Sequence, residues 1–489
     1  MKSILNIAAA ALILWLTACS APPAVNDTLP AEDIGVTGDL NHSPSTAAEW
    51  LERYIDGLVT KDELCQGLEP YSQQGVPALA TTPGVHVFSG SETVTADVSV
   101  GMDTTLVLLK GSELILGDGV TFEVLGRFFA LGDASAPVRI ASQGTYKTVR
   151  LQGAQSQCHH THFAHGIDLV TVAETGAADI LFTSCEFEHW DDVALRFTGA
   201  DGLAIVGCSF GLQSAGEAHG ECLNGKRSGA RIEDSVFGQM TAYSDAMDLE
   251  DCHGDHVPHI VGNTLLGGQD DGIDLDDCDA LVANNLVMDF WPADPANPYK
   301  GVNGGGITGH NSHPLLINNV VLRCFHGIGF KNGARPVLIH NTITDGHIGV
   351  SLYRTNSGYD DPHGTLINNI IVNNQAFDSG ANQDLLLHGR WWPSYDQTPG
   401  NQASVELQHN LFGFDMGGQT DRVGTPGFEW KNDLPFPAPD SLPVAAGLKL
   451  PVTVPGFPSD SVEVFFAEDY AGISRSQDAP TLGALEVHP

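Results

Sequence analysis

The sequence predicts an all-β protein built as a single-stranded parallel β-helix, a solenoid in which each coil of chain stacks on the one before. Short apolar segments with alternating polar residues recur along the chain, a polar residue returns at one fixed place in them, and glycine and asparagine punctuate the intervals. Branched apolar residues in runs of this length favour strands over helices. Because no such segment can bury its apolar side chains alone, we expect successive segments to stack.

The N-terminus has the features of an export signal. Residues 1–19 carry one lysine, an apolar run too short to span a bilayer comfortably, and small residues before Cys19. The segment LTAC resembles the lipobox of bacterial lipoproteins, which implies lipidation of Cys19. Residues 20–44 are rich in proline, alanine and acidic residues and are expected to form a flexible tether. We therefore expect an exported, lipid-anchored protein at the outer membrane or cell surface of a bacterium, with no membrane contact beyond that anchor.

Residues 45–84 are predicted to form an N-terminal cap. Thr46 and Glu49 have the spacing of a helix capping box, and the apolar residues from Trp50 to Val59 fall on one helical face. We expect this capping helix to cover the open end of the solenoid, because exposed edges of stacked strands invite aggregation.

The coils are predicted over residues 85–415. Their strands read AIVGCSF, HIVGNTL, LVANNLV, LLINNVV, VLIHNTI, TLINNII and ELQHNLF, and the fixed polar place is Cys208, Asn263, Asn285, Asn319, Asn341, Asn369 and Asn410. An asparagine returning at one turn can hydrogen-bond along the stack. This pattern resembles the right-handed β-helix of the pectin-lyase-like superfamily. The Pro-rich residues 416–489 are expected to pack on the solenoid as a C-terminal tail.

The composition limits the partners. The chain has 60 acidic residues against 22 Lys and Arg, a net charge of −38, which argues against nucleic acid as a partner. An acidic polysaccharide would also be repelled unless a divalent cation bridged it to the protein.

Eight cysteines follow Cys19, and Cys185/Cys208 and Cys252/Cys278 are spaced as neighbours on successive coils. Stacked thiols and disulfides both remain open, and we expect a monomer.

Aligning the coils by sequence predicts which side chains share a face. The segments AMDLED (246–251), GIDLDD (272–277), GITGHN (306–311), GIGFKN (327–332) and GVSLYR (349–354) superpose, and alternation turns Leu249, Leu275 and Phe330 inward. The predicted outer column is Glu250, Asp276, His310, Lys331 and Tyr353. A second column holds Asp248, Asp274, Thr308 and Ser351. Coils stack about 4.8 Å apart, so both columns form one continuous patch.

Acidic residues gather at one end of this patch. Asp245, Asp270 and Asp271 lie in the turns that precede the aligned strands, beside Asp274. Repulsion among these carboxylates must be offset by solvent, as in an ordinary acidic loop, by a cation or by a basic substrate. If a cation binds, oxygen ligands without a thiol suit Ca²⁺ or Mg²⁺.

Three motifs in order resemble polysaccharide lyase family 9, the calcium-dependent pectate lyases. They are SDAMD with Asp245, DDGID with Asp270, Asp271 and Asp274, and GFKNG with Lys331. The resemblance implies that the four aspartates bind Ca²⁺ and that Lys331 abstracts a proton. One departure is the coil GGGITGHN between Asp274 and Lys331, which could place the lysine a coil too far from calcium and leave His310 as the nearer base. Arg354, Tyr353, Asp276 and Glu250 are the candidate substrate-binding residues.

Two function classes follow from these residues. The first is an exported calcium-dependent lyase that cleaves a uronate-containing, pectate-like polysaccharide by β-elimination. The second is a non-catalytic surface β-helix that binds carbohydrate or has a structural role. Two weaker hypotheses are a glycoside hydrolase using Asp248 and Asp274, and an alginate C5-epimerase, to whose Asp-Pro-His signature the segment YDDPH (359–363) is similar. The proline and glycine in that segment favour an ordinary turn. The sequence leaves open the substrate, the base, the disulfide state and whether the protein is catalytic.

Overall fold

The computed structural model describes residues 44–487 except for 74, 154, 174–178, 213, 215–219, 242–243, 293–303, 356–357, 376–379, 388–401, 417, 433, 445, 450–464 and 477–479. The predicted signal with Cys19 and the tether up to residue 43 lie outside the described residues. Within the described ranges, none of the helices has the length and apolar character needed to cross a membrane.

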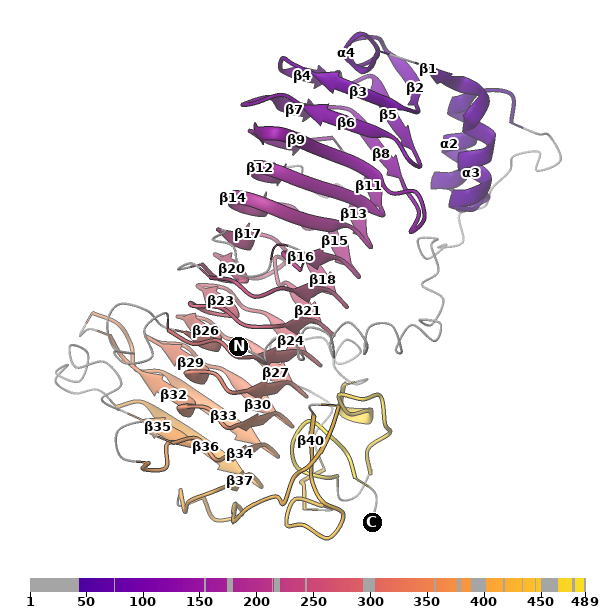
Figure 1. The fold of residues 1–489 in the computed structure, drawn as a ribbon. Coiled ribbons are helices and arrows are strands. Elements are labelled where there is room, and N and C mark those ends of the chain that lie inside the picture. The colour runs from indigo at the N-terminus through magenta and orange to yellow at the C-terminus, as the bar shows by residue number, and fades with distance from the viewer. Residues whose placement is uncertain are drawn as a thin grey trace.

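The chain winds into an elongated parallel β-helix, as Figure 1 shows. Successive coils contribute strands to three faces, and each strand pairs in parallel with its counterpart on the next coil. The all-β parallel solenoid predicted from the sequence is therefore confirmed. Sheet 1 has fourteen strands: β1 (Ser72–Gln73), β2 (Gly84–Phe88), β5 (Thr104–Leu109), β8 (Arg127–Leu131), β11 (Ser156–His159), β13 (Ile180–Thr183), β15 (Leu203–Val206), β18 (Arg231–Glu233), β21 (His259–Val261), β24 (Leu281–Ala283), β27 (Leu315–Ile317), β30 (Val337–Ile339), β33 (His363–Ile367) and β36 (Ser404–Gln408).

Two further faces, sheet 2 and sheet 3, are joined because two long strands bend from one into the other. These shared strands are β12 (Thr161–Val172) and β14 (Glu186–Thr198). Sheet 2 also contains β3 (Ser91–Val94), β6 (Glu113–Leu116), β9 (Val138–Tyr146), β16 (Ser209–Phe210), β19 (Val236–Phe237), β22 (Thr264–Leu265), β25 (Leu286–Met288), β28 (Val320–Leu322), β31 (Thr342–Thr344), β34 (Ile370–Val372), β37 (Leu411–Phe412) and β38 (Arg422–Val423). Sheet 3 also contains β4 (Val98–Val100), β7 (Thr121–Val124), β10 (Thr148–Leu151), β17 (Glu221–Lys226), β20 (Met247–Glu250), β23 (Ile273–Asp276), β26 (Gly305–His310), β29 (His326–Lys331), β32 (Ile348–Tyr353) and β35 (Leu385–Leu387).

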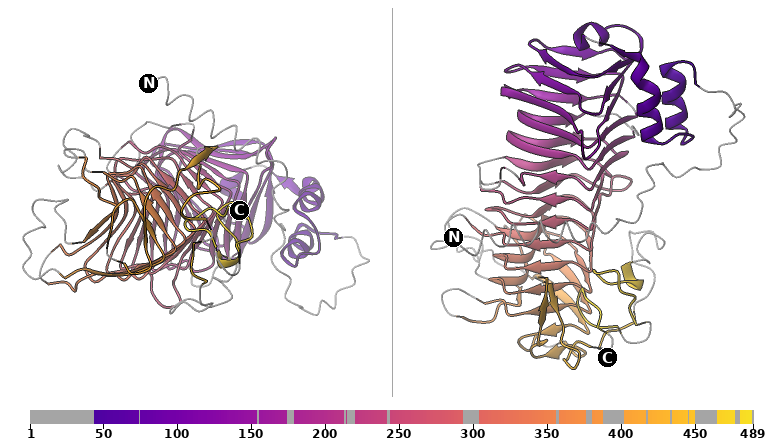
Figure 2. Two further views of the ribbon diagram at one scale, coloured as in Figure 1. Left: turned by 90° about the horizontal axis from the view of Figure 1, so that it is seen from below. Right: turned by 45° about the vertical axis from the view of Figure 1, so that its right-hand side comes forward.

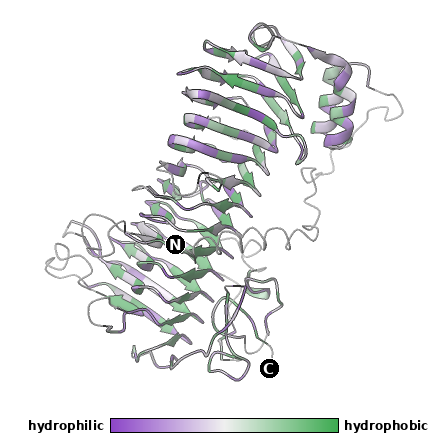
Figure 3. Ribbon diagram, in the orientation of Figure 1, coloured by the Kyte–Doolittle hydropathy of each residue, from purple (hydrophilic) through white to green (hydrophobic). Residues whose placement is uncertain are grey.

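The interior is filled by alternate residues of the strands, and Figure 3 shows apolar and polar residues alternating along them. Four phenylalanines of sheet 2 stack on successive coils with ring centroids 5.2, 4.6 and 4.8 Å apart: Phe163, Phe187, Phe210 and Phe237. Aromatic rings contribute the largest apolar areas to such a core. The eight cysteines among the described residues are buried free thiols, which answers the question that their spacing left open.

A ladder of asparagines runs along the turn between sheets 1 and 2. Its members, called the asparagine ladder below, are fully buried: Asn263, Asn285, Asn319, Asn341, Asn369 and Asn410. From Asn285 onward, each side-chain oxygen accepts from the backbone and side-chain amides of the asparagine on the preceding coil, as Asn319 Oδ1 does from Asn285 at 3.0 Å in both cases. Ser235, which the sequence alignment missed, continues the ladder by donating its backbone N–H to Asn263.

The N-terminal helices are α2 (Ala47–Ile55), α3 (Lys61–Leu68), the 3₁₀ helix Glu69–Tyr71 and α4 (Val76–Leu79). Leu51, Leu64 and Leu68 pack on the outer side chains of Val107 and Phe129 in sheet 1. Figure 2 shows α2 and α3 beside the first coils, a position that differs from the expected cover over the open end. The reason is that these first strands are apolar on both faces, as β5 is buried at every residue. Val76 of the short helix α4 instead joins the main core beside the first coils.

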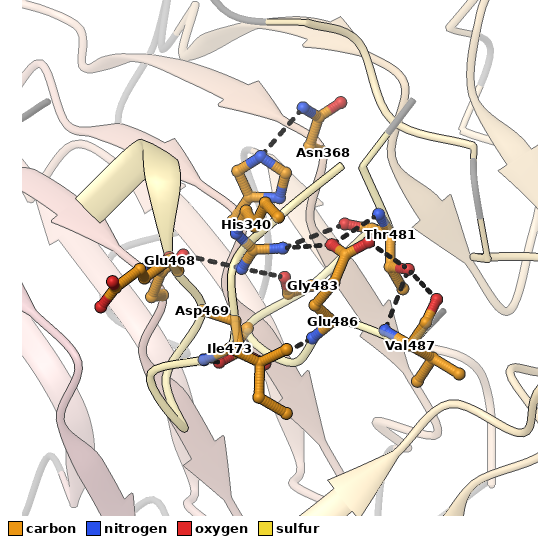
Figure 4. Close-up of polar contacts among 12 residues, drawn as sticks. His340, Asn368, Glu468, Asp469, Ile473, Thr481, Gly483, Glu486 and Val487 are labelled. Atoms are coloured by element: carbon orange, nitrogen blue, oxygen red, sulfur yellow. Dashed lines mark hydrogen bonds and ion pairs between the residues drawn. The ribbon is translucent and has the colours of Figure 1, made fainter. Parts of the chain in front are cut away.

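The C-terminal tail covers the outside of later coils in the same way. Within this tail, β39 (Glu429–Lys431) and β40 (Leu434–Phe436) form a short antiparallel hairpin, which comes before the segments that cover the coils. Phe465 and Phe466 pack on the outer apolar side chains of sheet 1. Figure 4 shows the tail segment around Glu486 lying against His340 and Asn368 of the coils. A buried ion pair joins Arg475 to Glu486 at 3.3 Å there.

Candidate functional site

The register of sheet 3 is the one that the sequence alignment predicts. Asp248 pairs with Asp274, and Asp274 with Thr308. In the outer column Glu250, Asp276, His310, Lys331 and Tyr353 follow one another on successive strands from β20 to β32. Alternation leaves Asp248, Glu250, Asp274 and Asp276 partly exposed while the residues between them are buried. These polar residues therefore share one exterior surface of the solenoid.

Three of the predicted metal ligands come together just before this surface. Asp245 lies in the turn before β20, and Asp270 and Asp271 lie in the turn before β23. Carboxylate oxygens of these three residues all lie within 4.8 Å of one another. The backbone N–H of Asp271 donates to Asp245 Oδ1 at 2.8 Å, so the two turns are tied together. Stacking of coils has built the cluster, as the sequence predicts.

The coil after the cluster supplies the hydrogen bonds that position Asp271. The backbone N–H of Gly305 donates to Asp271 Oδ1 at 2.6 Å, and Thr308 Oγ1 lies 2.7 Å from Asp271 Oδ2. The same hydroxyl lies 3.0 Å from Asp274 Oδ1 and thereby links the fourth predicted ligand to the group. Asp271 is 2% exposed, so its carboxylate cannot obtain its remaining hydrogen bonds from bulk water.

The electrostatics of these carboxylates are those of a group that lacks positive charge. Burial first, and then the charges of Asp274 and Asp270, raise the pKa of Asp271 well above its usual value. Burial and then Asp271 and Asp274 raise the pKa of Asp245 in the same way. Burial, followed by Glu221 and Asp274, raises the pKa of Asp248 to about 8. A bound cation would offset this mutual repulsion.

The donor set fits a hard divalent cation. Asp245, Asp270 and Asp271 offer carboxylate oxygens from two adjacent coils, and Asp274 lies beside them, which is the chemistry that Ca²⁺ prefers. Glu221 with Asp245 and Asp248 forms a second oxygen group of the same compactness. Sequence reasoning missed Glu221, although its segment ECLNGK occupies the coil directly before AMDLED and would have extended the alignment.

Lys331 reaches toward the acidic end in spite of the extra coil. Strand β26 does lie between β23 and β29, but Lys331 Nζ extends along the outer column to 3.9 Å from Asp276 Oδ1. Burial disfavours the charge of Lys331, yet Asp274, Tyr353 and Asp276 outweigh burial and raise its pKa above the usual value. The amine is therefore protonated at neutral pH in this state.

His310 lies between Asp276 and Lys331 in the outer column. Its ring meets that of Tyr359 edge-on, with centroids 4.9 Å apart, and its Nδ1 lies 3.9 Å from Asp277 Oδ2. Burial lowers the pKa of His310, with Asp277 opposing and Lys331 adding to the shift. An imidazole in this position is neutral at pH 7 and can accept a proton. Tyr359, 41% exposed, is an aromatic residue at the site that the sequence reasoning did not assign.

The predicted substrate-binding residues differ in how they are presented. Asp276 lies beside Lys331, and Glu250 accepts from Lys226 Nζ at 2.7 Å. Tyr353 is 7% exposed and packs with Phe325 and Ile348, which differs from the expected sugar-stacking ring. Arg354 lies 3.3 Å from Asp361 in an ion pair and is only 11% exposed. Arg354 also donates to the backbone carbonyl of Tyr359 at 3.5 Å. Both side chains are therefore engaged within the protein.

Other sequence candidates are placed elsewhere or lie beyond the described ranges. His363 of the YDDPH segment begins β33 and its Nδ1 lies 2.8 Å from Ser404 Oγ, so it belongs to sheet 1 and the turn interpretation fits. Asp248 accepts from Asn224 Nδ2 at 2.9 Å. Two further segments are candidates by sequence: HGRWWPSYD (388–396), which could supply sugar-stacking rings or a lid, and the insertion DFWPADPANPYKG (289–301), which could border the site or only pack against it. The first and most of the second lie outside the described residues.

Comparison with known proteins bears on the fold. A family model described as "Right handed beta helix region" matches residues 222–384. The protein is a right-handed parallel β-helix. This right-handed β-helix is similar to the solved structure of pectate lyase Pel9A, with 14% identity and a TM-score of 0.39 over 84% of this chain and 90% of that one. It is also similar to the structure of the PL6 family alginate lyase AlyGC, with 14% identity and a TM-score of 0.34 over 67% of this chain and 52% of that one. It is also similar to the periplasmic alginate epimerase AlgG (14%, 0.29, 68% and 79%). At these values the likenesses concern the fold alone. No curated protein matches the chain.

Proposed function

We propose that this right-handed β-helix is a calcium-dependent polysaccharide lyase that cleaves a uronate-containing, pectate-like polysaccharide by β-elimination. The observation that carries the proposal is the placement of Asp245, Asp270 and Asp271 with their oxygens within 4.8 Å, on the same surface as a lysine and a histidine. Asp274 would complete the ligand set. When bound there, a calcium ion would supply positive charge that attracts the uronate carboxylate and acidifies its C5 hydrogen.

Lys331 is the proposed base. It would take the C5 proton, the electron pair would form the C4–C5 double bond, and the C4–oxygen bond would break as the leaving oxygen gains a proton. A lysine must be neutral for this step, and the acidic residues around Lys331 raise its pKa. The amine therefore becomes competent only as pH rises, and an alkaline optimum follows.

His310 is the alternative base, and its lowered pKa favours it near neutral pH. It is one strand nearer to Asp274 than Lys331 is. If His310 took the proton, Lys331 would remain protonated beside Asp276 and would stabilise negative charge. The two assignments therefore predict different pH profiles from the same surface.

The remaining residues of the surface would bind the sugar chain. Asp276 and Glu250 can accept hydrogen bonds from sugar hydroxyls, and the exposed ring of Tyr359 offers a face for stacking. We further propose that the protein is exported and anchored through a lipidated Cys19, which places this surface outside the cytoplasm with an acidic polysaccharide as partner. The alternative function is a non-catalytic surface protein that binds carbohydrate with calcium as a structural ion.

The test follows the ultraviolet absorbance of an unsaturated uronate product when the protein without its first 43 residues is given polygalacturonate or alginate, with Ca²⁺ or with EDTA. We expect a Ca²⁺-dependent signal that Lys331→Ala lowers by about a thousandfold, in line with loss of a general base. Loss in His310→Ala instead, with activity that plateaus near neutral pH, would move the base to His310.

Two other outcomes would remove the proposal. Reducing ends that appear without the unsaturated product would indicate a hydrolase, for which the pKa of Asp248 at about 8 provides a general acid. Calcium binding without any cleavage of either uronan would favour the non-catalytic alternative. Asp255→Asn, an exposed change outside the site, serves as the matched control for all these assays.

A further inference from the structure

A hollow of about 260 Å³ lies where the C-terminal hairpin meets the coils. One wall is formed by Asp345, which follows β31, and by Asn373, which follows β34 one coil later. The opposite wall is formed by Pro426, Phe428 and Trp430 of the segment that leads into and through β39. The hollow is thus bounded by a polar wall of the solenoid and an aromatic wall of the hairpin.

The aromatic wall is fixed in place by its own hairpin. Trp430 alternates with Glu429 and Lys431, which form an ion pair at 3.5 Å, and Lys431 also lies 5.2 Å from the ring centroid of Phe436. Phe428 packs against the apolar cluster of Ile370, Val372 and neighbouring residues. Its ring meets that of Trp430 edge-on at 6.2 Å. Trp430 nevertheless remains 49% exposed, so a large flat apolar surface faces the solvent beside the hollow.

The polar wall presents hydrogen-bonding groups from two stacked turns. Asp345 and Asn373 both have left-handed backbone with φ of 61°, so they are equivalent positions on consecutive coils. Burial raises the pKa of Asp345, and the neighbouring side chains of Asn373 and Thr344 partly oppose that rise. Of the described residues lining the hollow, Asp345 alone carries an ionisable side chain. The nearby guanidinium of Arg323 binds both oxygens of Asp289 at 2.7 Å.

This combination matches the chemistry of a sugar ring. A pyranose has an apolar C–H face that packs on an indole and an edge of hydroxyls that donate to a carboxylate or bond to an amide. The hollow is smaller than the sites of drug-sized ligands, which have volumes of about 300–1,000 Å³, and therefore suits a single ring. A uronate would bring its carboxylate against Asp345. We propose that this hollow binds a neutral sugar residue of a polysaccharide, as a second carbohydrate site distinct from the acidic surface of sheet 3.

The test is affinity electrophoresis of the protein without its first 43 residues. The native gels contain β-glucan, galactan, mannan or xylan, with polygalacturonate as the acidic comparison. EDTA in the gel keeps cation binding at sheet 3 from contributing. We expect retardation by at least one neutral polysaccharide, weakened about tenfold in Trp430→Ala and in Asp345→Ala, because each removes one wall. Trp430→Phe keeps an aromatic surface and should retain part of the affinity.

Phe414→Ala is the matched control, because Phe414 is a 59% exposed aromatic that does not line the hollow. Urea unfolding of each variant separates loss of the site from loss of the fold. Lys331→Ala should be retarded as strongly as the parent protein. This result would show that sugar binding in the hollow does not depend on the proposed lyase site. The proposal is overturned if no neutral polysaccharide retards the protein, if polygalacturonate alone does so, or if Trp430→Ala runs like the parent while folded.

Discussion

The asparagine ladder and the acidic residues of sheet 3 both repeat from coil to coil, but the ladder satisfies its own hydrogen bonds and the acidic residues do not. Each ladder side chain donates and accepts, so Asn319 accepts from Asn285 and donates to Val282 O and Asn341. The acidic group of Asp245, Asp248, Asp270, Asp271 and Asp274, called the acidic face below, consists of acceptors. Among the hydrogen bonds that its members accept are those from the backbone N–H groups of Asp271 and Gly305 and from the side chains of Asn224 and Thr308. Stacked amides thus satisfy one another's hydrogen bonds, whereas stacked carboxylates repel one another, and bound protons or a cation would offset that repulsion.

Replacing one asparagine of the ladder by an aspartate should lower the stability of the protein more than any other change considered. Asn319→Asp keeps the acceptor oxygen but removes the amide that donates to Val282 O and Asn341 Oδ1. It also buries an unpaired negative charge in a fully enclosed turn. We expect a loss of about 3–5 kcal/mol in the free energy of unfolding, measured by urea denaturation.

The control is Asn432→Asp, since Asn432 is exposed and the same change there buries no charge. This change should leave stability within about 0.5 kcal/mol of the parent. A similar small effect for Asn319→Asp would mean that the ladder contributes little to holding the coils together.

Replacing an aspartate of the acidic face by an asparagine should not lower the stability of the protein when no cation is present. Asp271→Asn removes one charge from a group whose members raise each other's pKa, so in EDTA the variant should be at least as stable as the parent. With Ca²⁺ at a hundred times its dissociation constant, the parent should gain about 2.7 kcal/mol, and the variant should lose most of this gain. Thermal unfolding with and without the ion provides the measurement. Equal stabilisation of both proteins by Ca²⁺ would place the ion elsewhere.

The sequence predicts the strand register that aligns the asparagine ladder and the acidic face, but it does not predict which other elements surround them. Alternation fixes which side chains face outward, because a shift of one residue would turn every apolar residue of the acidic strands to solvent. Glu221 was missed because the strand alignment began at AMDLED, although the preceding strand ECLNGK pairs with it in register and follows the aligned segment AIVGCSF. Strand β5 illustrates the other limit: all six of its residues, TTLVLL, are buried, so its pattern does not reveal that α2 and α3 cover its outer face.

Tyr359 shows why the candidate site could be only partly derived. It belongs to the coil of β32, but its ring lies against His310, which is two strands earlier in sheet 3. The contact depends on a loop folding back along the stack, and the backbone N–H of Gly333 donates to Asp360 O at 2.7 Å to hold it there. Coil alignment assigns residues to strands, so it carries no information on where a loop between strands lies.

The smallest expected effect concerns a buried group that remains neutral, in contrast to the acidic face. Burial first, and then Lys61, lowers the pKa of His159 from its usual value of about 6.5 to about 3. Because the folded pKa is depressed, the unfolded chain takes up the proton first, so stability is present above pH 6.5 and is lost as pH falls toward 3. Asp248, with its pKa raised to about 8, has the opposite sign and loses stability as pH rises through that value.

Lowering the pH from about 7 to about 5.5 should therefore cost the parent about 1 kcal/mol through His159, and His159→Gln should remove that part of the pH dependence. Tyr54 Oη of α2 donates to Gln157 Oε1 at 2.9 Å and lies 3.2 Å from His159 Nε2, so this imidazole lies where the helix is attached to sheet 1. Urea midpoints at the two pH values measure the difference, with His253→Gln as the control because that side chain is 50% exposed. Identical slopes for the parent and His159→Gln would show that acid acts elsewhere. A slope reduced only in His159→Gln would show that a buried group can be neutral and satisfied on the flank of the same solenoid whose acidic face we propose to bind a cation.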